Sequence, residues 1–137
     1  MVDQSADLAK QVENVVEGGT ATSRIFTSSD PLVGDLATAI DKAIPGKVVD
    51  VNRIIKDPSG RILIDLDIEL DNIIIQVKSG GGKGLTTQLE NTANATGKTV
   101  IGYGPDIKSS VLKGAQQKGY EVFTNLDDLL KYIQGVK

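Results

Sequence analysis

Residues 62–78 read ILIDLDIELDNIIIQVK, and this stretch decides the fold. Over residues 62–70 apolar side chains recur at every second position, which is the pattern of a strand with one buried face. Asp71-Asn72 is a plausible two-residue hairpin turn, and residues 73–79 then form the returning strand. The sequence therefore predicts an antiparallel hairpin whose register is set by that turn.

This register gathers polar side chains on one side of the hairpin. A two-residue turn places Asp67 opposite Gln76 and Asp65 opposite Lys78. Alternation then predicts a core face and a polar face; the core face carries Leu66, Ile68, Ile75 and Val77, and the polar face carries Asp65, Asp67, Glu69, Gln76 and Lys78. Carboxylates in one small patch repel each other unless a cation such as Mg²⁺ lies between them. A solvated strand face with cross-strand Asp–Lys pairs is the alternative interpretation.

The flanking segments predict an α/β domain. Apolar spacing and turn residues predict helices over 3–17, 31–44, 85–95, 107–118 and 126–133, and further strands over 47–55, 99–103 and 120–123. Residues 20–30 are rich in Thr and Ser and predict a loop. We therefore divide the chain into an N-terminal helix and loop over residues 1–30 and one domain over residues 31–137.

Composition excludes several classes of site. The chain has 137 residues, a net charge of -3, no cysteine and no histidine. Disulfides, thiolate-zinc sites and Ser-His-Asp triads are therefore excluded, and catalysis must use Asp, Glu, Lys, Ser, Thr, Tyr or a metal held by oxygen atoms. No uninterrupted apolar run exceeds three residues, so we expect no membrane span, and the first twenty residues predict no signal peptide.

Residues 64–78 resemble the core motif of the PD-(D/E)xK nuclease superfamily. That motif is an acid on one strand followed, after a turn, by (D/E/Q)-x-K on the next strand, and here Asp67 stands nine residues before Gln76, with Lys78 completing the motif. The predicted order of helix, three strands, helix and strand also matches the restriction-endonuclease-like αβββαβ core. The resemblance implies an α/β fold of that type, with a mixed sheet and a C-terminal α/β extension.

The resemblance implies a metal-dependent endonuclease with Mg²⁺, or Mn²⁺ or Zn²⁺, as cofactor. Asp67 matches the metal-binding aspartate, Gln76 occupies the second acidic position as a metal ligand, and Lys78 matches the catalytic lysine. Gln76 departs from the usual acid, because one neutral oxygen holds a metal less tightly than a carboxylate does.

A further acid from the helix before the first strand often completes the metal site in this superfamily. Asp35 is our candidate, because it opens the helix predicted over residues 31–44. Glu17 and Asp41 are its rivals.

Residues 77–80, followed by 85–92 and 100–105, are similar to nuclease toxin domains at the C-terminal ends of large secreted bacterial proteins. These include the toxins of contact-dependent growth inhibition and related polymorphic toxins. The resemblance implies a domain secreted as part of a larger protein, acting in the target-cell cytoplasm on tRNA or DNA, and bound by a cognate immunity protein. A non-catalytic binding module with the same fold is the alternative.

Three residues are candidates for contacts with nucleic acid. Lys83 lies in the Gly-rich segment 79–84, Gln88 lies on the helix that follows, and Tyr103 ends a buried strand. Backbone N–H groups at a helix start can accept a phosphate, but the segment does not match GxxxxGK[ST] and is equally consistent with a flexible connection. An aromatic ring at residue 103 can stack on a base, although a plain strand-to-helix turn also explains it.

Overall fold

The computed structural model describes residues 12–15 and 23–135. Within them the fold is α/β, with four helices, a mixed five-stranded sheet and a separate two-stranded sheet. The elements are β1 (Val12–Val15), β2 (Ser23–Phe26), α1 (Pro31–Ala43), β3 (Val48–Lys56), β4 (Ile62–Leu70), β5 (Ile73–Val77), α2 (Leu85–Thr96), β6 (Thr99–Tyr103), α3 (Ser109–Gln117), β7 (Val122–Phe123) and α4 (Leu126–Gly135). The predicted α/β class with a mixed sheet is confirmed.

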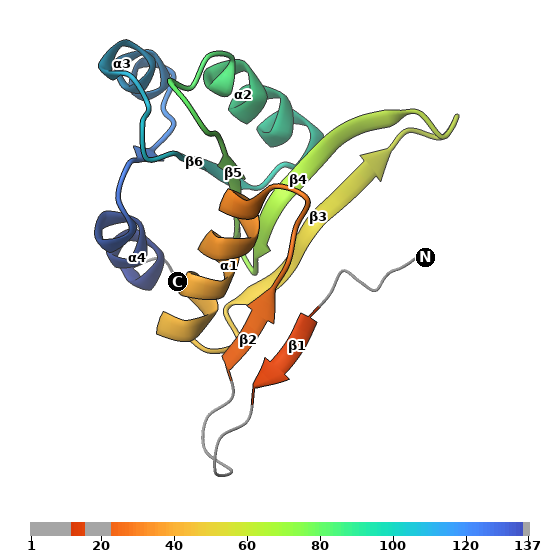
Figure 1. Ribbon diagram of the computed structural model, residues 1–137. Helices are drawn as coiled ribbons and strands as arrows, with labels where there is room; N and C mark the ends of the chain where they lie inside the picture. Colours follow the sequence, from red (N-terminus) through yellow and green to blue (C-terminus); the bar gives the residue numbers. More distant parts are fainter. Residues whose placement is uncertain (1–11, 16–22, 136–137) are drawn as a thin grey trace.

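The five-stranded sheet has the order β3-β4-β5-β6-β7. Strands β3, β4 and β5 form an antiparallel meander, and β6 and β7 run parallel to β5 (Figure 1). The pairs Ile68–Ile75 and Glu69–Ile74 have the register that a two-residue turn predicts. The hairpin prediction is therefore confirmed next to its turn.

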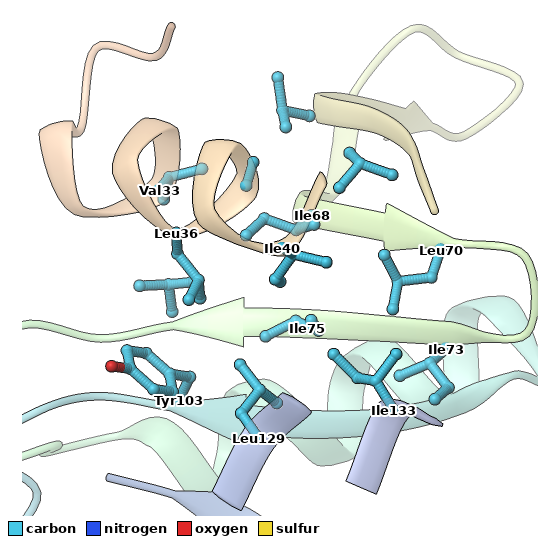
Figure 2. Close-up of a cluster of buried hydrophobic side chains, with 14 of the residues drawn as sticks. Val33, Leu36, Ile40, Ile68, Leu70, Ile73, Ile75, Tyr103, Leu129 and Ile133 are labelled. Carbon is cyan, nitrogen blue, oxygen red and sulfur yellow. The ribbon is translucent and has the colours of Figure 1, made fainter. Parts of the chain in front are cut away.

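Helices cover both faces of this sheet, α1 and α4 on one side and α2 and α3 on the other (Figure 1). Figure 2 shows the α1/α4 side, where side chains of β4, β5 and β6 meet the two helices. Its buried core includes Leu36, Ile40, Ile68, Ile75, Ile101, Tyr103, Leu129 and Ile133. The opposite core includes Leu66, Ile74, Leu85, Leu89, Val100, Ala115 and Val122.

Helix α1 begins as its sequence predicts. Asp30 accepts a hydrogen bond from the Leu32 N–H at 3.0 Å, and Pro31 occupies the first helical turn. The apolar stripe of the helix is buried against the sheet. Because Asp30 caps α1, the packing of α1 on the sheet also sets where Asp30 lies relative to the sheet.

The predicted N-terminal helix is wrong where the structure describes it. Residues 12–15 form β1, which pairs antiparallel with β2, and β2 also replaces part of the predicted loop over 20–30. Arg24 of β2 binds the buried carboxylate of Asp41 and donates to the Val48 carbonyl oxygen, fastening β2 to α1 and β3. Such long-range partners override a short helical spacing pattern. The remainder of the predicted helix, 3–11 and 16–17, lies outside the described residues.

A helix that crosses a bilayer needs about twenty consecutive, mostly apolar residues. Among residues 12–15 and 23–135, no helix is long and apolar enough to cross a membrane. This agrees with the short apolar runs of the sequence, none of which exceeds three residues.

Candidate functional site

The β4–β5 ladder stops two residue pairs after its turn, and side chains replace it. The last regular pair is Ile68–Ile75, so Asp67 is the next residue opposite Gln76. There the Asp67 N–H donates to Gln76 Oε1 at 3.0 Å, and the Val77 N–H donates to Asp67 Oδ2 at 2.8 Å. Two side chains therefore bridge β4 and β5 where backbone pairing ends.

Gln76 is enclosed between β4 and α2. Its relative exposure is 0%, and its Nε2 donates to the Asp65 carbonyl oxygen and to Thr92 Oγ1, each at 2.8 Å. Together with the bond from the Asp67 N–H, these bonds join the Gln76 amide to both strand β4 and helix α2. The amide predicted as a metal ligand is thus hydrogen-bonded within the fold at both of its polar atoms, and metal binding by Gln76 stays a prediction.

Strand β3 is irregular at the same level of the sheet. Asn52 stands opposite Asp67, because Val51 pairs with Ile68 and Arg53 pairs with Leu66. Its φ is 57°, and among the described residues no other non-glycine residue has a positive φ. Asn tolerates the left-handed conformation better than most residues do. The cross-strand row Asn52, Asp67 and Gln76 thus combines a left-handed residue in β3 with interrupted backbone pairing between β4 and β5.

The faces of β4 exchange across this row. Ile68 packs in the α1/α4 core, whereas Leu66 packs with Ile74 in the α2/α3 core. Strict alternation would place Leu66 and Ile68 on one face, so that prediction is wrong. The predicted polar face is divided as well. Gln76 bonds to Thr92 of α2, whereas Asp67 bonds to the N–H of Val77.

Glu69 is part of the sheet rather than of the candidate site. It is 4% exposed and accepts two hydrogen bonds from Arg53 of β3, Nε to Oε1 at 2.7 Å and Nη2 to Oε2 at 2.9 Å. This two-point pairing satisfies a buried carboxylate across neighbouring strands. Glu69 therefore has a structural partner.

The carboxylate of Asp67 has a perturbed protonation equilibrium. Burial raises the pKa of Asp67 from 3.8 to about 6, opposed by the hydrogen bond from Val77. The negative charges of Asp30 and Asp65 raise this pKa further, and the positive charge of Lys78 lowers it. Asp67 is thus the centre of a small charged group that also contains Lys78.

Asp30, rather than Asp35, is the α1-side acid whose charge acts on Asp67. Ser28 Oγ accepts from the Asp30 N–H at 3.1 Å and from Asn52 Nδ2 at 2.8 Å, which fastens the residues before α1 to β3 opposite Asp67. Asp35 is exposed on α1. In the sequence, an acid directly before Pro31 is typical of a helix cap, and capping alone explains Asp30 without a functional role.

Of the two rivals of Asp35, only Asp41 lies among the residues that the structure describes. Asp41 is buried and accepts from Arg24 Nη2 at 2.7 Å and from the Gly46 N–H at 3.1 Å, and these bonds hold its pKa below the usual value against the effect of burial. It therefore belongs to the anchor of β2 rather than to the Asp67 group. Glu17 lies outside the described residues.

The acidic side chains around Asp67 are few for a metal site made by the protein alone. Across residues 12–15 and 23–135, no group of three or more acidic side chains is arranged to hold a metal ion. Mg²⁺ often needs less, because it keeps several waters and takes one or two carboxylates together with substrate phosphate oxygens. Asp67 with Asp30 or Asp65 is compatible with that smaller requirement.

The Gly-rich segment 79–84 is packed at its middle, whereas residues 79, 80, 83 and 84 are exposed. Gly82 is buried against Ile107, and the Gly81 carbonyl oxygen accepts from the Lys108 N–H at 3.0 Å. A Cβ at residue 104 would collide with the carbonyl oxygen of Lys78, so β6 approaches the end of β5 closely. The phosphate-contact and flexible-connection interpretations of this segment both stay predictions.

The three predicted nucleic-acid contacts have different surroundings. Lys83 is exposed, and Gln88 is partly exposed one helical turn before Thr92. Tyr103 is only 8% exposed, and its ring lies in the α1/α4 core near Leu129 (Figure 2). Burial raises the pKa of the Tyr103 phenol. The ring of Tyr103 is thus mostly buried in the core, and its stacking on a base stays a prediction.

No protein-family model matches the chain, and no curated protein or solved structure shows a significant match. Its function is therefore inferred from its own residues. These are the carboxylate of Asp67, the charges of Asp30, Asp65 and Lys78 around it, and the break in the β4–β5 ladder that holds them.

Proposed function

We propose that this chain is a metal-dependent nuclease domain of the PD-(D/E)xK type, with Asp67 as its principal metal ligand. The order α1-β3-β4-β5-α2-β6, with β6 parallel to β5, accords with the αβββαβ core. The observation that carries the proposal is the break between β4 and β5. There a largely buried carboxylate lies within electrostatic reach of a lysine at the carboxyl end of β5.

The residues of the site suit a hard cation. Asp67 supplies a carboxylate that Val77 orients through one oxygen, and Asp30 or Asp65 supplies a second. A Mg²⁺-type ion bound there would lower the pKa of a bound water and polarise a phosphoryl oxygen. The Lys78 ammonium orients the attacking water and balances the negative charge that develops on the phosphate. These roles require the Asp67 carboxylate and the Lys78 ammonium to lie close together.

Protonation of Asp67 competes with metal binding. Its pKa of about 6 means that the carboxylate is mostly ionised at pH 7 and mostly protonated at pH 5. A bound cation requires the ionised form. We therefore expect metal affinity and cleavage to fall together as the pH is lowered through 6.

The substrate class follows from charge and from the sequence resemblance. A chain of net charge -3 is poorly suited to long duplex contacts, which favours a compact contact with one tRNA or a short DNA segment. Lys83 is exposed and available for a phosphate. Secretion within a larger toxin, action in the target-cell cytoplasm and capture by an immunity protein complete the proposal.

A cleavage assay tests this function. Wild type, Asp67→Asn and Lys78→Met are incubated with tRNA or plasmid in Mg²⁺ or EDTA, with Asp35→Asn and Lys98→Met as charge-matched controls at exposed positions. We expect cleavage only with metal, a loss of about a hundredfold or more in the two site variants, and near-normal cleavage in the controls. Metal-independent cleavage, or equal cleavage by Asp67→Asn, contradicts the proposal.

A non-catalytic binding module is the second candidate. Two observations favour it: the amide of Gln76 is used by the fold, and the described residues hold no group of three acids. This function predicts no cleavage by the wild type in any metal. It also predicts that a partner binds equally well to wild type and to Asp67→Asn.

A further inference from the structure

The hydrogen bonds around Gln76 admit only one orientation of its amide. Thr92 Oγ1 donates its one proton to the Gln88 carbonyl oxygen at 2.7 Å, so it can only accept from Gln76. The Asp65 carbonyl oxygen is also only an acceptor, and both lie 2.8 Å from Nε2. The Asp67 N–H is only a donor and faces Oε1. The site therefore presents two acceptors and one donor, which is the complement of a primary amide.

A glutamate does not fit this arrangement. Its carboxylate has no proton to give to the Asp65 carbonyl oxygen, and two acceptor oxygens would face each other in a fully buried place. Its negative charge would also lie beside the Asp67 group, where Asp30 and Asp65 already contribute negative charge. The fold thus selects glutamine at residue 76.

Gln76 and Asp67 also bond to each other's strand reciprocally. The Gln76 side chain accepts from the Asp67 N–H, and the Asp67 side chain accepts from the Val77 N–H. The two bonds join β4 and β5 directly beyond the last regular pair of the ladder. The first bond fixes the backbone of Asp67, and the second fixes the direction of its carboxylate.

We infer that Gln76 is a positioning residue, whose amide is held by Thr92 and aims the Asp67 carboxylate at the end of β5. It acts through Asp67 rather than on a metal ion. The inference rests on the proposed function only in taking Asp67 as the metal-binding acid. The bonds themselves belong to the metal-free protein.

Amide hydrogen exchange of the metal-free protein, followed by NMR, tests this inference. Gln76→Met keeps the length of the side chain and removes its polar atoms. We expect about ten- to hundredfold faster exchange at Asp67 and also at Val77, whose N–H Gln76 does not touch, while Glu69 and Ile74 in the regular ladder keep their protection. Unchanged protection of the Val77 N–H overturns the inference, because Asp67 would then be oriented without Gln76.

Thr92 provides an independent variant pair if Gln76→Met folds poorly. Thr92→Val keeps the shape and removes the acceptor, and Thr92→Ser retains the hydroxyl. We expect faster exchange at Asp67 and Val77 in Thr92→Val and wild-type exchange in Thr92→Ser. Equal exchange in the two variants overturns the role of the hydroxyl and with it the inference.

Gln76→Glu separates positioning from metal binding. We expect its unfolding equilibrium constant to rise by about ten- to hundredfold and its affinity for Mg²⁺, measured by calorimetry, not to increase. Undiminished stability with tighter Mg²⁺ binding overturns the inference and assigns residue 76 to the metal. Failure of the proposed nuclease appears elsewhere, as absent cleavage by the wild type, and leaves the exchange result standing.

Discussion

The two halves of the β4–β5 hairpin share one alternating sequence but have different structures. Near the turn, Ile68 pairs with Ile75 through the backbone, and both side chains are fully buried. One residue farther, Asp67 and Gln76 bridge the strands with their side chains. The difference shows that alternation specifies the strands, whereas polar side chains that reach neighbouring backbone groups decide where regular pairing ends.

The comparison extends to the strand beside the hairpin. Strand β3 shifts its register between Val48 and Asp50, beside the turn-proximal half of β4, and takes a left-handed residue, Asn52, opposite Asp67. Within the hairpin itself, Ile68 and Ile75 are joined by regular pairing and apolar burial, whereas Asp67 and Gln76 are joined by side-chain hydrogen bonds. Substitutions in the two halves should therefore differ in both size and kind.

The largest expected effect lies in the regular half. Ile75→Ala removes a side chain of 0% exposure from the α1/α4 core and should lower the free energy of unfolding by about 2–5 kcal/mol. Ile75→Val is the matched control, with an expected loss of about 0.5–1.5 kcal/mol. Urea denaturation measures both. A loss below that of the valine variant would show that the regular half does not depend on apolar packing.

Asp67→Asn should raise the free energy of unfolding at pH 7, whereas Ile75→Ala lowers it. Because the folded pKa of about 6 exceeds 3.8, the folded state holds its proton over that pH interval while the unfolded state releases it. Asp67 thus adds to the free energy of unfolding below pH 3.8, and this contribution is lost as the pH rises to 6. The loss is up to about 3 kcal/mol, at about 1.4 kcal/mol per pKa unit. Asp67→Asn should therefore be more stable than wild type at pH 7.

The pH series supplies the control for Asp67→Asn. The stability advantage of the variant should shrink as the pH is lowered from 7 to 4, because wild-type Asp67 regains its proton. Denaturation midpoints at several pH values measure it. An advantage that does not vary with pH would mean that Asp67 is not the titrating group.

Substitutions of Asn52 should change the free energy of unfolding least. Asn52→Ala places a Cβ-bearing residue without a local polar group at φ 57° and removes the bond to Ser28, for an expected loss of about 1–2 kcal/mol. Asn52→Gly removes the same bond but tolerates the backbone, so its loss should be about half as large. Thermal unfolding compares them. Equal losses would assign the effect to the Ser28 bond rather than to the backbone conformation.

Local signals made much of the fold predictable. The Asp30–Pro31 start of α1, the Asp71-Asn72 turn and the Gly97 end of α2 each act within a few residues, and the structure contains all three. The β1–β2 pairing was not predictable in the same way. It depends on Arg24 reaching Asp41, seventeen residues away and on another element.

The candidate site was predicted only in part. The charge of Lys78 acts on Asp67, which is consistent with the motif spacing. The surroundings of Gln76 and Tyr103 were not predictable, because Thr92 lies on a later helix and the core around Tyr103 includes residues of α4. Side-chain partners that arrive from distant elements leave no periodic signal in the sequence.

The central claim is that Asp67 holds a divalent cation beside Lys78. Titration of the ¹⁵N-labelled protein with Mg²⁺ at pH 7 tests it most directly. We predict saturable shifts of the Asp67, Val77 and Lys78 amide signals in wild type and in Asp35→Asn, and their loss in Asp67→Asn. Absent shifts in the wild type, or the same shifts in Asp67→Asn, would contradict the claim.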